Sequence, residues 1–306
     1  MNVTLELIKE NGSVSSEDRI LSFAFEKNAY IPYTRLSVSF ISGELFFTSV
    51  AEIKLIIDGK TVHHGLIDTI KSRQHDSRII VRLVSKGFTS LLCRNQIEPG
   101  LKTGISLNSL MDSFYTIPYV THEDNSDVSN YIYVRKNTSM WDAVSNLSYK
   151  LLGTYPYIRD ENRVMITPYP TPSEFTYEIS ERMAVGYEYD YTRMASNYHM
   201  ADINGEYGHY ELQDNDVLDK KIVRHEYSDL DMRFLYSPQT ALEYRNKFDT
   251  RGKMAVYCEY IGYRGEDLFD IMRFSSSSYG RIKSMRITGN SKGVFTKVMR
   301  YTDKFV

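Results

Sequence analysis

The segment from residue 51 to residue 85 constrains the fold most, because it has the pattern of three β-strands joined by two short turns. In the first strand, AEIKLIID, apolar and charged residues alternate, which places one face on a core and the other in solvent. The Asp58-Gly59 pair then supplies the positive φ angles of a tight hairpin turn. TVHHGLIDTIKS returns as the second strand, and RIIVRLVS follows the polar turn RQHDS as the third. Such a meander is predicted to roll into a barrel or a sandwich.

The apolar positions of the meander define a predicted core face: Ala51, Ile53, Leu55 and Ile57, then Val62, Leu66 and Ile70, then Ile79, Val81 and Leu83. Upstream, LSFAFEK and LSVSFIS add at least two predicted strands. Downstream, Gly87 is expected to end the third strand, and Pro99-Gly100 marks the exit from the domain. Between them, Phe88, Leu91 and Leu92 form an apolar patch at helical spacing. We expect both leucines to be buried and the patch to plug an open barrel end.

The section from about residue 101 to residue 170 changes to a helical period. SLNSLMDSF has an apolar stripe made of Leu107, Leu110, Met111 and Phe114. The strongest predicted helix is SMWDAVSNLSYKLLG, whose stripe is Met140, Val144, Leu147 and Leu151. Ser139 and Asp142 fit a capping box at its start, and Gly153 suits the left-handed conformation at its end. A hairpin, TYPYI-RDEN-RVMITPYP, follows, so this section is predicted to be a small α/β unit.

Strand patterns resume at about residue 171. YEISERMAVGYEYDYTRMASNYHMADING is Tyr-rich and alternating, and further strands are predicted at KMAVYCEYIGY, YGRIKSMRI and GVFTKVMRYT. The loop GNSKG joins the last two as a hairpin. One helix, SPQTALEYRNKF, interrupts the strands, with Ser237 as its cap and Pro238 in its first turn. Its inward residues are predicted to be Ala241, Tyr244 and Phe248.

These patterns predict a mainly β protein of the α+β class, in which two β-barrel domains flank a small α/β unit. The predicted boundaries are residues 1–100 for the first barrel, 101–170 for the α/β unit and 171–306 for the second barrel with its one helix. The order of strands and helices, rather than sequence identity, indicates that the second barrel is a distant duplicate of the first.

The composition favours sheets and subunit contacts, because the chain has 25 Tyr and 14 Phe against a single Trp. Its formal net charge of −2 is unlike the basic stripe of a nucleic-acid-binding protein. No run approaches the ~18 apolar residues of a membrane-spanning helix, and MNVTLELIKENGS lacks the pattern of a secretion signal. We interpret Cys93 and Cys258 as reduced, buried small side chains.

Three polar clusters resemble metal sites only superficially. His63 and His64 are adjacent in a predicted strand, so their side chains point to opposite faces and cannot share one ion. HEDNSD, residues 122–127, offers carboxylates without a fixed ligand spacing. DNDVLD, residues 214–219, lacks the Gly and the later Glu of a calcium loop. We interpret the two acidic runs as a solvated loop and an exposed turn.

No catalytic motif is present in the sequence. It has no HExxH and no GxSxG elbow, and SSSSYG at residues 275–280 lacks the Lys and the strand–loop–helix order of a phosphate-binding loop. Paired carboxylates of a glycosidase must lie ~5–10 Å apart in a groove, which sequence spacing does not specify. We therefore predict no enzyme activity, no cofactor and no catalytic, cofactor-binding or metal-binding residues.

Three segments in order resemble a known family. AEIKLIIDGKTVHHGLIDTIKSRQHDSRIIVRLVSKGFTSLLCRNQIEPG holds two strands around a DG turn, a third strand, a short Leu-Leu helix and a Pro. NTSMWDAVSNLSYKLLGTYPYIRDENRVMITPYP places a Trp-containing helix before a hairpin, and YGRIKSMRITGNSKGVFTKVMRY forms a closing hairpin. This order resembles the central hub proteins of contractile-tail baseplates, found in myophage tails, R-type bacteriocins and type VI spike bases. In one departure, RGEDLFD stands where a GD is expected before the late strands.

The resemblance implies that each subunit has two tube-like barrels and that three subunits form a ring. Such a homotrimer joins a sixfold tail tube to a threefold spike. The implied partners are the tail tube protein, the central spike protein and other baseplate or tape-measure proteins. The implied location is the tail baseplate of a virion or a bacteriocin particle, assembled in the bacterial cytoplasm.

A physical argument independent of the family points the same way. Open edge strands are an aggregation hazard unless another chain covers them, and a closed ring of copies pairs every edge and stops growth. Two alternatives stay open. One is another β-rich tail assembly protein, such as a tube, adaptor or adhesin component, and the other is a hydrolase that acts on the cell wall.

Overall fold

The structure, a computed structural model, describes residues 1–43, 49–76, 78–113, 116–192, 194–230, 237–251, 253–274 and 278–302. Its first strands are β1 (Val3–Lys9), β2 (Val14–Glu17), β3 (Ile20–Asn28), β4 (Arg35–Ser42), β5 (Val50–Ile57), β6 (Lys60–His75) and β7 (Arg78–Gly87). The middle strands are β8 (Gly100–Ile105), β9 (Thr121–His122), β10 (Ser129–Val134), β11 (Tyr157–Arg159) and β12 (Arg163–Met165). The last strands are β13 (Glu174–Thr176), β14 (Arg182–Tyr189), β15 (Asn197–Met200), β16 (Tyr210–Gln213), β17 (His225–Ser228), β18 (Met254–Ile261), β19 (Ile271–Arg273), β20 (Tyr279–Asn290) and β21 (Gly293–Tyr301). The helices are η1 (Phe88–Cys93), α1 (Leu107–Asp112), α2 (Met140–Leu152), η2 (Ile179–Glu181), α3 (Asn215–Asp219) and α4 (Pro238–Arg251).

The first seven strands form the predicted meander and its neighbours, in the order β2-β1-β5-β6-β7-β4-β3. Asp58 and Gly59 have φ angles of 48° and 81°, as a tight hairpin turn between β5 and β6 requires. The alternation in β5 puts Ile53, Leu55 and Ile57 in a buried core. The sequence pattern therefore predicted this sheet and most of its core face correctly, whereas Ala51 is only partly buried and Leu66 packs against the core of the middle unit.

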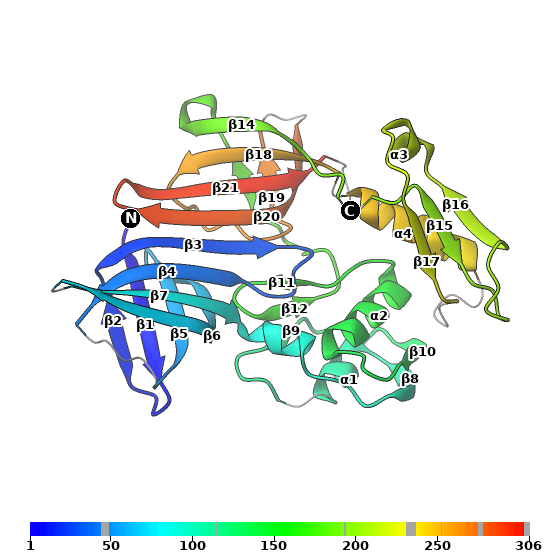
Figure 1. Ribbon diagram of the computed structural model, residues 1–306, viewed down its shortest axis with the longest axis horizontal. Helices are drawn as coiled ribbons and strands as arrows, with labels where there is room; N and C mark the ends of the chain where they lie inside the picture. Colours follow the sequence, from blue (N-terminus) through cyan, green and yellow to red (C-terminus); the bar gives the residue numbers. More distant parts are fainter. Residues whose placement is uncertain are drawn as a thin grey trace.

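The first and last sheets join edge to edge through antiparallel pairing of β3 with β20 (Figure 1). The path β14-β18-β21-β20-β3 is therefore continuous with the first sheet, and Met285 and Ile287 of β20 share its core. The mainly β, α+β class is confirmed. The described strands do not close into separate barrels, because the path runs open from β14 to β2.

The middle of the chain packs α1, α2 and two small sheets around a core of its own (Figure 1). The predicted capping box is confirmed: Ser139 accepts a hydrogen bond from the Asp142 backbone N–H, and the Asp142 carboxylate accepts one from Ser139. Gly153 takes the predicted left-handed conformation, with φ 61°. Met140, Val144 and Leu147 are buried, as their spacing predicts, whereas Phe114 lies outside the described residues.

The patch formed by Phe88, Leu91 and Leu92 differs from the prediction. Phe88 and Leu92 are buried, but Leu91 is only partly buried, and all three pack in the core of the middle unit with α2. The reason is the path of the chain, which leaves β7 at Gly87 and turns as η1 toward α2. The patch is thus the contact of the middle unit with the first sheet rather than a plug of the first core.

Replacement of Leu92 by aspartate should leave little folded protein. Leu92 is 1% exposed, and burying an unpaired charge costs several kcal/mol. The matched control is Leu101→Asp, because Leu101 is 62% exposed. Soluble yield and urea unfolding should separate the two variants, and equal stability would show that the patch tolerates a charge.

An insert between β14 and β18 carries β15, β16, β17, α3 and α4. It extends to one side of the molecule (Figure 1) and has a separate small core around Tyr198, Met200, Ala241 and Leu242. The prediction of one helix in this section missed α3, which Asp214 caps by accepting a hydrogen bond from the Val217 backbone N–H. None of the described helices is long and apolar enough to cross a membrane.

Candidate interaction surfaces

In the described part of the chain, the core face of the last sheet becomes exposed at β14. One row across the sheet runs from Val298 on β21 through Cys258 on β18 to Val185 on β14. Val298 and Cys258 are fully buried, whereas Val185 is 45% exposed. In the next row Val256 is buried and its β14 partner Tyr187 is 63% exposed. An apolar core face thus continues onto a strand that the described residues leave largely exposed on this side.

The same strand is a free edge. In the described chain β14 pairs only with β18, and β2, at the opposite end of the path, pairs only with β1. β2 is a short polar strand, VSSE, whereas β14 spans Arg182–Tyr189 and carries exposed Met183 and Tyr189 beside Val185 and Tyr187. Long apolar edges of this kind are sites of pairing with another chain.

The sequence pattern identified β14 as Tyr-rich and alternating but did not reveal this surface. Alternation shows that Met183, Val185, Tyr187 and Tyr189 share one face. It cannot show which elements cover that face, because the covering elements come from distant parts of the chain.

A buried charge network ties three parts of the chain together. Lys27 of β3 lies 2.5 Å from the Asp267 carboxylate, and Arg159 of β11 lies 2.8 Å from Asp270. The Asp160 backbone N–H donates to Asp267 as well, at 2.7 Å. Burial alone would lower the pKa of Arg159, but Asp267 and Asp270 raise it above its ordinary value. The RGEDLFD segment therefore fastens the last sheet to the first sheet and the middle unit.

The remaining carboxylate of that segment, Glu266, is equally buried. Tyr177 donates a hydrogen bond to it at 2.7 Å, and Tyr260 donates another. Burial, with Glu266 adding to it, raises the pKa of both tyrosines far above the ordinary value, so both remain neutral donors. The departure from the expected GD thus has a structural role.

The two histidines of β6 have separate surroundings. His63 is fully buried between Thr34 and Ser85, whose hydroxyls lie 2.8 Å from its Nδ1 and Nε2. His64 lies 2.8 Å from the Glu52 carboxylate and against the Phe88 ring. The Thr–His–Ser chain has the form of a catalytic relay, but all three side chains are fully buried, so no substrate reaches it.

Acid should destabilise the protein through His63. Burial, with His64 adding to it, lowers its pKa from 6.5 to about 3. Above pH 6.5 neither the folded nor the unfolded state takes up this proton, so the contribution of His63 to stability is complete. Below pH 6.5 only the unfolded chain is protonated, and stability falls toward pH 3 by up to about 1.4 kcal/mol per pH unit.

Urea unfolding at several pH values measures this slope. His63→Gln should flatten it, whereas His209→Gln, which changes an exposed histidine of the insert, should leave it as in the wild type. An unchanged slope in His63→Gln would mean that other groups account for the acid sensitivity.

The acidic runs serve local structure. Within residues 122–127, Glu123 is buried and accepts hydrogen bonds from the backbone N–H groups of Ile166 and Thr167 at 2.7 and 2.9 Å. In DNDVLD, Asp214 caps α3. Residues 275–277 of SSSSYG lie outside the described residues. Across the described ranges, no group of three or more His, Cys, Asp or Glu is placed to hold a metal ion.

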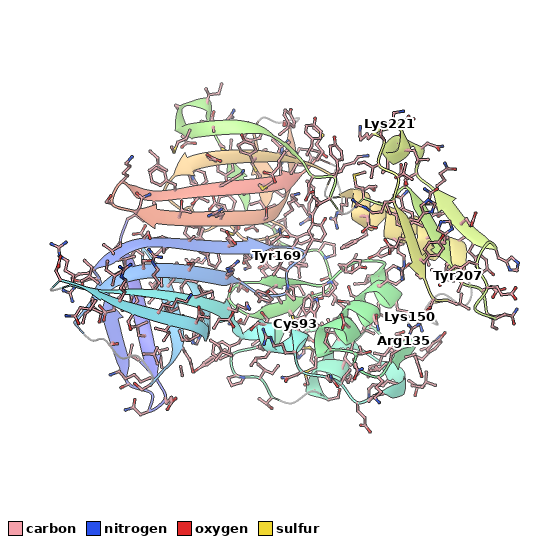
Figure 2. All side chains as sticks on the ribbon, viewed as in Figure 1. Cys93, Arg135, Lys150, Tyr169, Tyr207 and Lys221 are labelled. Carbon is pink, nitrogen blue, oxygen red and sulfur yellow. The ribbon has the colours of Figure 1, made fainter. Side chains whose placement is uncertain are left out.

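The outer face of the insert sheet carries a short chain of hydrogen-bonded side chains. His199 Nε2 lies 2.9 Å from His225 Nδ1, and His199 Nδ1 lies 3.0 Å from Glu211. Tyr227 stacks on His199, with ring centroids 4.5 Å apart, and Tyr207 packs edge-on against Tyr227. Figure 2 shows Tyr207 on this outlying part of the molecule. These rings add an exposed polar surface that the sequence analysis did not single out.

Neither cysteine forms a disulfide. Cys258 is buried as expected, but Cys93 is only partly buried. Burial raises the pKa of both thiols to about 11, and Asp142 contributes to the shift at Cys93. Both are therefore unreactive thiols at neutral pH.

The similarity of this chain to known proteins was found by structure. No protein-family model matches it, and no curated protein matches it by sequence. The 43 kDa tail protein of prophage MuSo2 from Shewanella oneidensis superposes with a TM-score of 0.72 at 10% identity, over 99% of this chain and 98% of that chain. The tail protein from Neisseria meningitidis MC58 gives 0.72 at 11% identity, over 99% and 97%.

A third structure belongs to an Escherichia coli component of the type VI secretion system that is itself similar to the T4 tail proteins gp27 and gp5. It gives a TM-score of 0.59 at 8% identity, over 94% of this chain and 74% of that chain. The chain therefore has the mainly β fold of these tail proteins, although its two sheets form one open path instead of the two barrels that the resemblance to baseplate hubs implies.

Proposed function

We propose that this protein is the structural hub of a contractile tail or injection particle, and that three copies form a ring between tail tube and spike. The observation that carries the proposal is the row from Val298 through Cys258 to Val185, where a buried core face ends on an exposed strand. In obligate oligomers, an exposed apolar face of this kind is typically buried against a second chain, which completes the hydrophobic core.

The topology supports a closed ring rather than a two-fold pair. Each chain supplies one open sheet with two different ends, β14 and β2. A contact between unlike ends is head-to-tail, and head-to-tail contacts close into rings when the rotation between copies allows it. In the proposed ring, β3–β20 joins the two sheets within a chain, and the β14 face meets the first sheet of the next chain near β2.

The proposed role is structural and not catalytic, and the proposed partners are a tail tube protein, a central spike protein and other baseplate or tape-measure proteins. The charged side chains of the buried network pair with one another: Arg159 forms an ion pair with Asp270, and Lys27 forms one with Asp267. Such a network suits a part that must stay rigid while a tail contracts. The proposed location is the baseplate of a virion or bacteriocin particle that assembles in the bacterial cytoplasm.

Electron microscopy of the purified chain, alone and mixed with its tail tube protein, tests the proposal. We expect rings with threefold outline and a central opening, which cap the ends of tube segments. Rings of another symmetry that build into tubes would instead favour a tube or adaptor protein. Particles that never bind tube ends would contradict the hub role.

A further inference from the structure

The β6–β7 hairpin, whose end projects from the first sheet (Figure 1), carries a group of cations on its outer face. Lys71 and Arg82 lie directly opposite each other in the register of the two strands, and Arg73 lies opposite Ile80. Arg78 and Arg82 flank Ile80 on β7, and all four cations are exposed. Residues that lie opposite each other, or two apart along a strand, point to the same side of a sheet. These four cations (Lys71, Arg73, Arg78 and Arg82) therefore form one basic face.

The members of the basic face are close enough to act together. Arg78 and Arg82 are four residues apart on one strand, which is about 14 Å, and the neighbouring strand is about 5 Å away. These separations are comparable to the screening length of about 8 Å in physiological salt. Like charges directly opposite each other, as Lys71 and Arg82 are, destabilise a sheet. An anion bound to the basic face would remove this repulsion.

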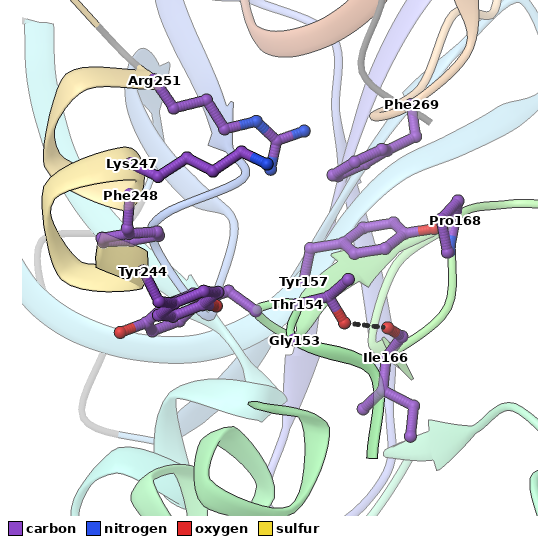
Figure 3. A pocket seen from close by; sticks show the side chains of 11 residues that line it. Gly153, Thr154, Tyr157, Ile166, Pro168, Tyr244, Lys247, Phe248, Arg251 and Phe269 are labelled. Carbon is purple, nitrogen blue, oxygen red and sulfur yellow. Dashed lines mark hydrogen bonds between the residues drawn. The ribbon is translucent and has the colours of Figure 1, made fainter. Parts of the chain in front are cut away.

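Other cations of the chain have partners within it. On the same side of the sheet, Arg286 of β20 lies 3.5 Å from the Glu26 carboxylate of β3. On α4, Arg251 extends into a small pocket (Figure 3) and lies over the Tyr301 ring at 4.2 Å. Within the described ranges, by contrast, no member of the basic face forms an ion pair with a carboxylate or lies over an aromatic ring. No direct contact in this part of the chain therefore neutralises its charge.

Apolar side chains lie between these cations. Ile80, which Arg78 and Arg82 flank, lies opposite Ile41 of β4, and both isoleucines are only partly buried. Protein interfaces combine apolar side chains with arginine in this way. A nucleic-acid backbone would contact only the cations, and a single strand would also need aromatic rings for its bases, whereas the neighbours here are Ile41, Ile80 and Ser39. The composition of the face thus favours a protein partner.

We propose that the basic face binds an acidic segment of a partner protein, whose carboxylates pair with the four cations and whose apolar side chains pack on Ile41 and Ile80. Complementary charge of this kind selects the partner and fixes its orientation. The identification of the partner as a tail component rests on the proposed function, but the chemistry of the segment rests on the face alone. The proposed ring contact uses the core face of β14, so it does not account for cations on the outer face of the first sheet.

The test uses random peptides displayed on phage and selected against the full-length protein. We expect enriched peptides in which Asp or Glu adjoins Val, Ile or Leu. Synthetic copies are then measured by fluorescence anisotropy against the wild type and two variants. Arg82→Glu should weaken binding by at least about tenfold, because it replaces an attraction with a repulsion. Lys221→Glu makes the same charge change at an exposed residue of the insert (Figure 2) and should stay within about twofold of the wild type.

A double-stranded DNA oligonucleotide is measured in the same assay and should bind at least about tenfold more weakly than the peptides at physiological salt. Four results would overturn the proposal: no enriched peptide, enriched peptides without acidic residues, equal binding to the wild type and Arg82→Glu, or DNA binding that is tighter than peptide binding and is lost in Arg82→Glu. Both substituted residues are exposed, so circular dichroism should show both variants folded as the wild type is.

Light scattering on the same samples reports the oligomeric state, which Arg82→Glu should leave unchanged. Peptide binding by a single chain would support the basic face and contradict the ring. Trimers that bind no peptide would support the ring and contradict the basic face.

Discussion

Replacement of Val185 by aspartate should prevent self-association while the chain stays folded. Val185 lies at the exposed end of a row whose other members, Cys258 and Val298, are buried. In the single chain an aspartate at this place remains in water, whereas in the proposed contact it is buried without a partner, at a cost of several kcal/mol. A loss of that size weakens association by at least about a hundredfold. Sedimentation velocity across a concentration series measures the change.

The matched control is Ile203→Asp, which makes a similar change at a residue that is 80% exposed on the insert. This variant should associate as the wild type does. Tyr187→Asp, in the next row of β14, should repeat the effect of Val185→Asp. Wild-type association by both β14 variants would exclude the core face of β14 from the contact.

Replacement of Arg159 by methionine should destabilise the fold by about 3–5 kcal/mol, because it leaves Asp270 buried without its cation. Methionine keeps much of the volume of the arginine stem, so the lost charge dominates the effect. The guanidinium also lies over the Tyr169 ring at 3.5 Å and donates to the Leu268 carbonyl, and both contacts are lost with it. Urea unfolding measures the difference in free energy.

A more exposed arginine–carboxylate pair, between β19 and β13 of the large sheet, gives the comparison. Arg273 lies 3.1 Å from Glu174, but both side chains are partly in solvent. Arg273→Met should therefore cost at most about 1 kcal/mol. If Arg159→Met is as stable as Arg273→Met, the network around RGEDLFD does not hold the sheets together.

Local signals predicted the local structure well. The Asp58-Gly59 turn, the capping box of Ser139 and Asp142, and the left-handed Gly153 follow from short-range chemistry and are all present. Alternation in β5 correctly gave its buried face. In each case the determining residues lie within a few positions of one another, so the sequence contains the whole interaction.

Long-range features could not be predicted in the same way. The carboxylates of Asp267 and Asp270 are close together in the sequence, but their buried partners Lys27 and Arg159 come from β3 and β11, far away in the chain. The β3–β20 pairing joins strands more than 250 residues apart, which turns two expected barrels into one open path. Likewise, of the two leucines predicted to be buried, Leu92 is buried and Leu91 only partly so, and the core that receives both belongs to the middle unit.

The mass of the wild-type chain in solution tests the central claim most directly. Sedimentation equilibrium at micromolar concentration should give three times the chain mass of 35.6 kDa, and Val185→Asp should give the mass of one chain. A wild-type mass of one chain under the same conditions, with β14 open to solvent, would contradict the claim that copies of this protein complete one another's sheets.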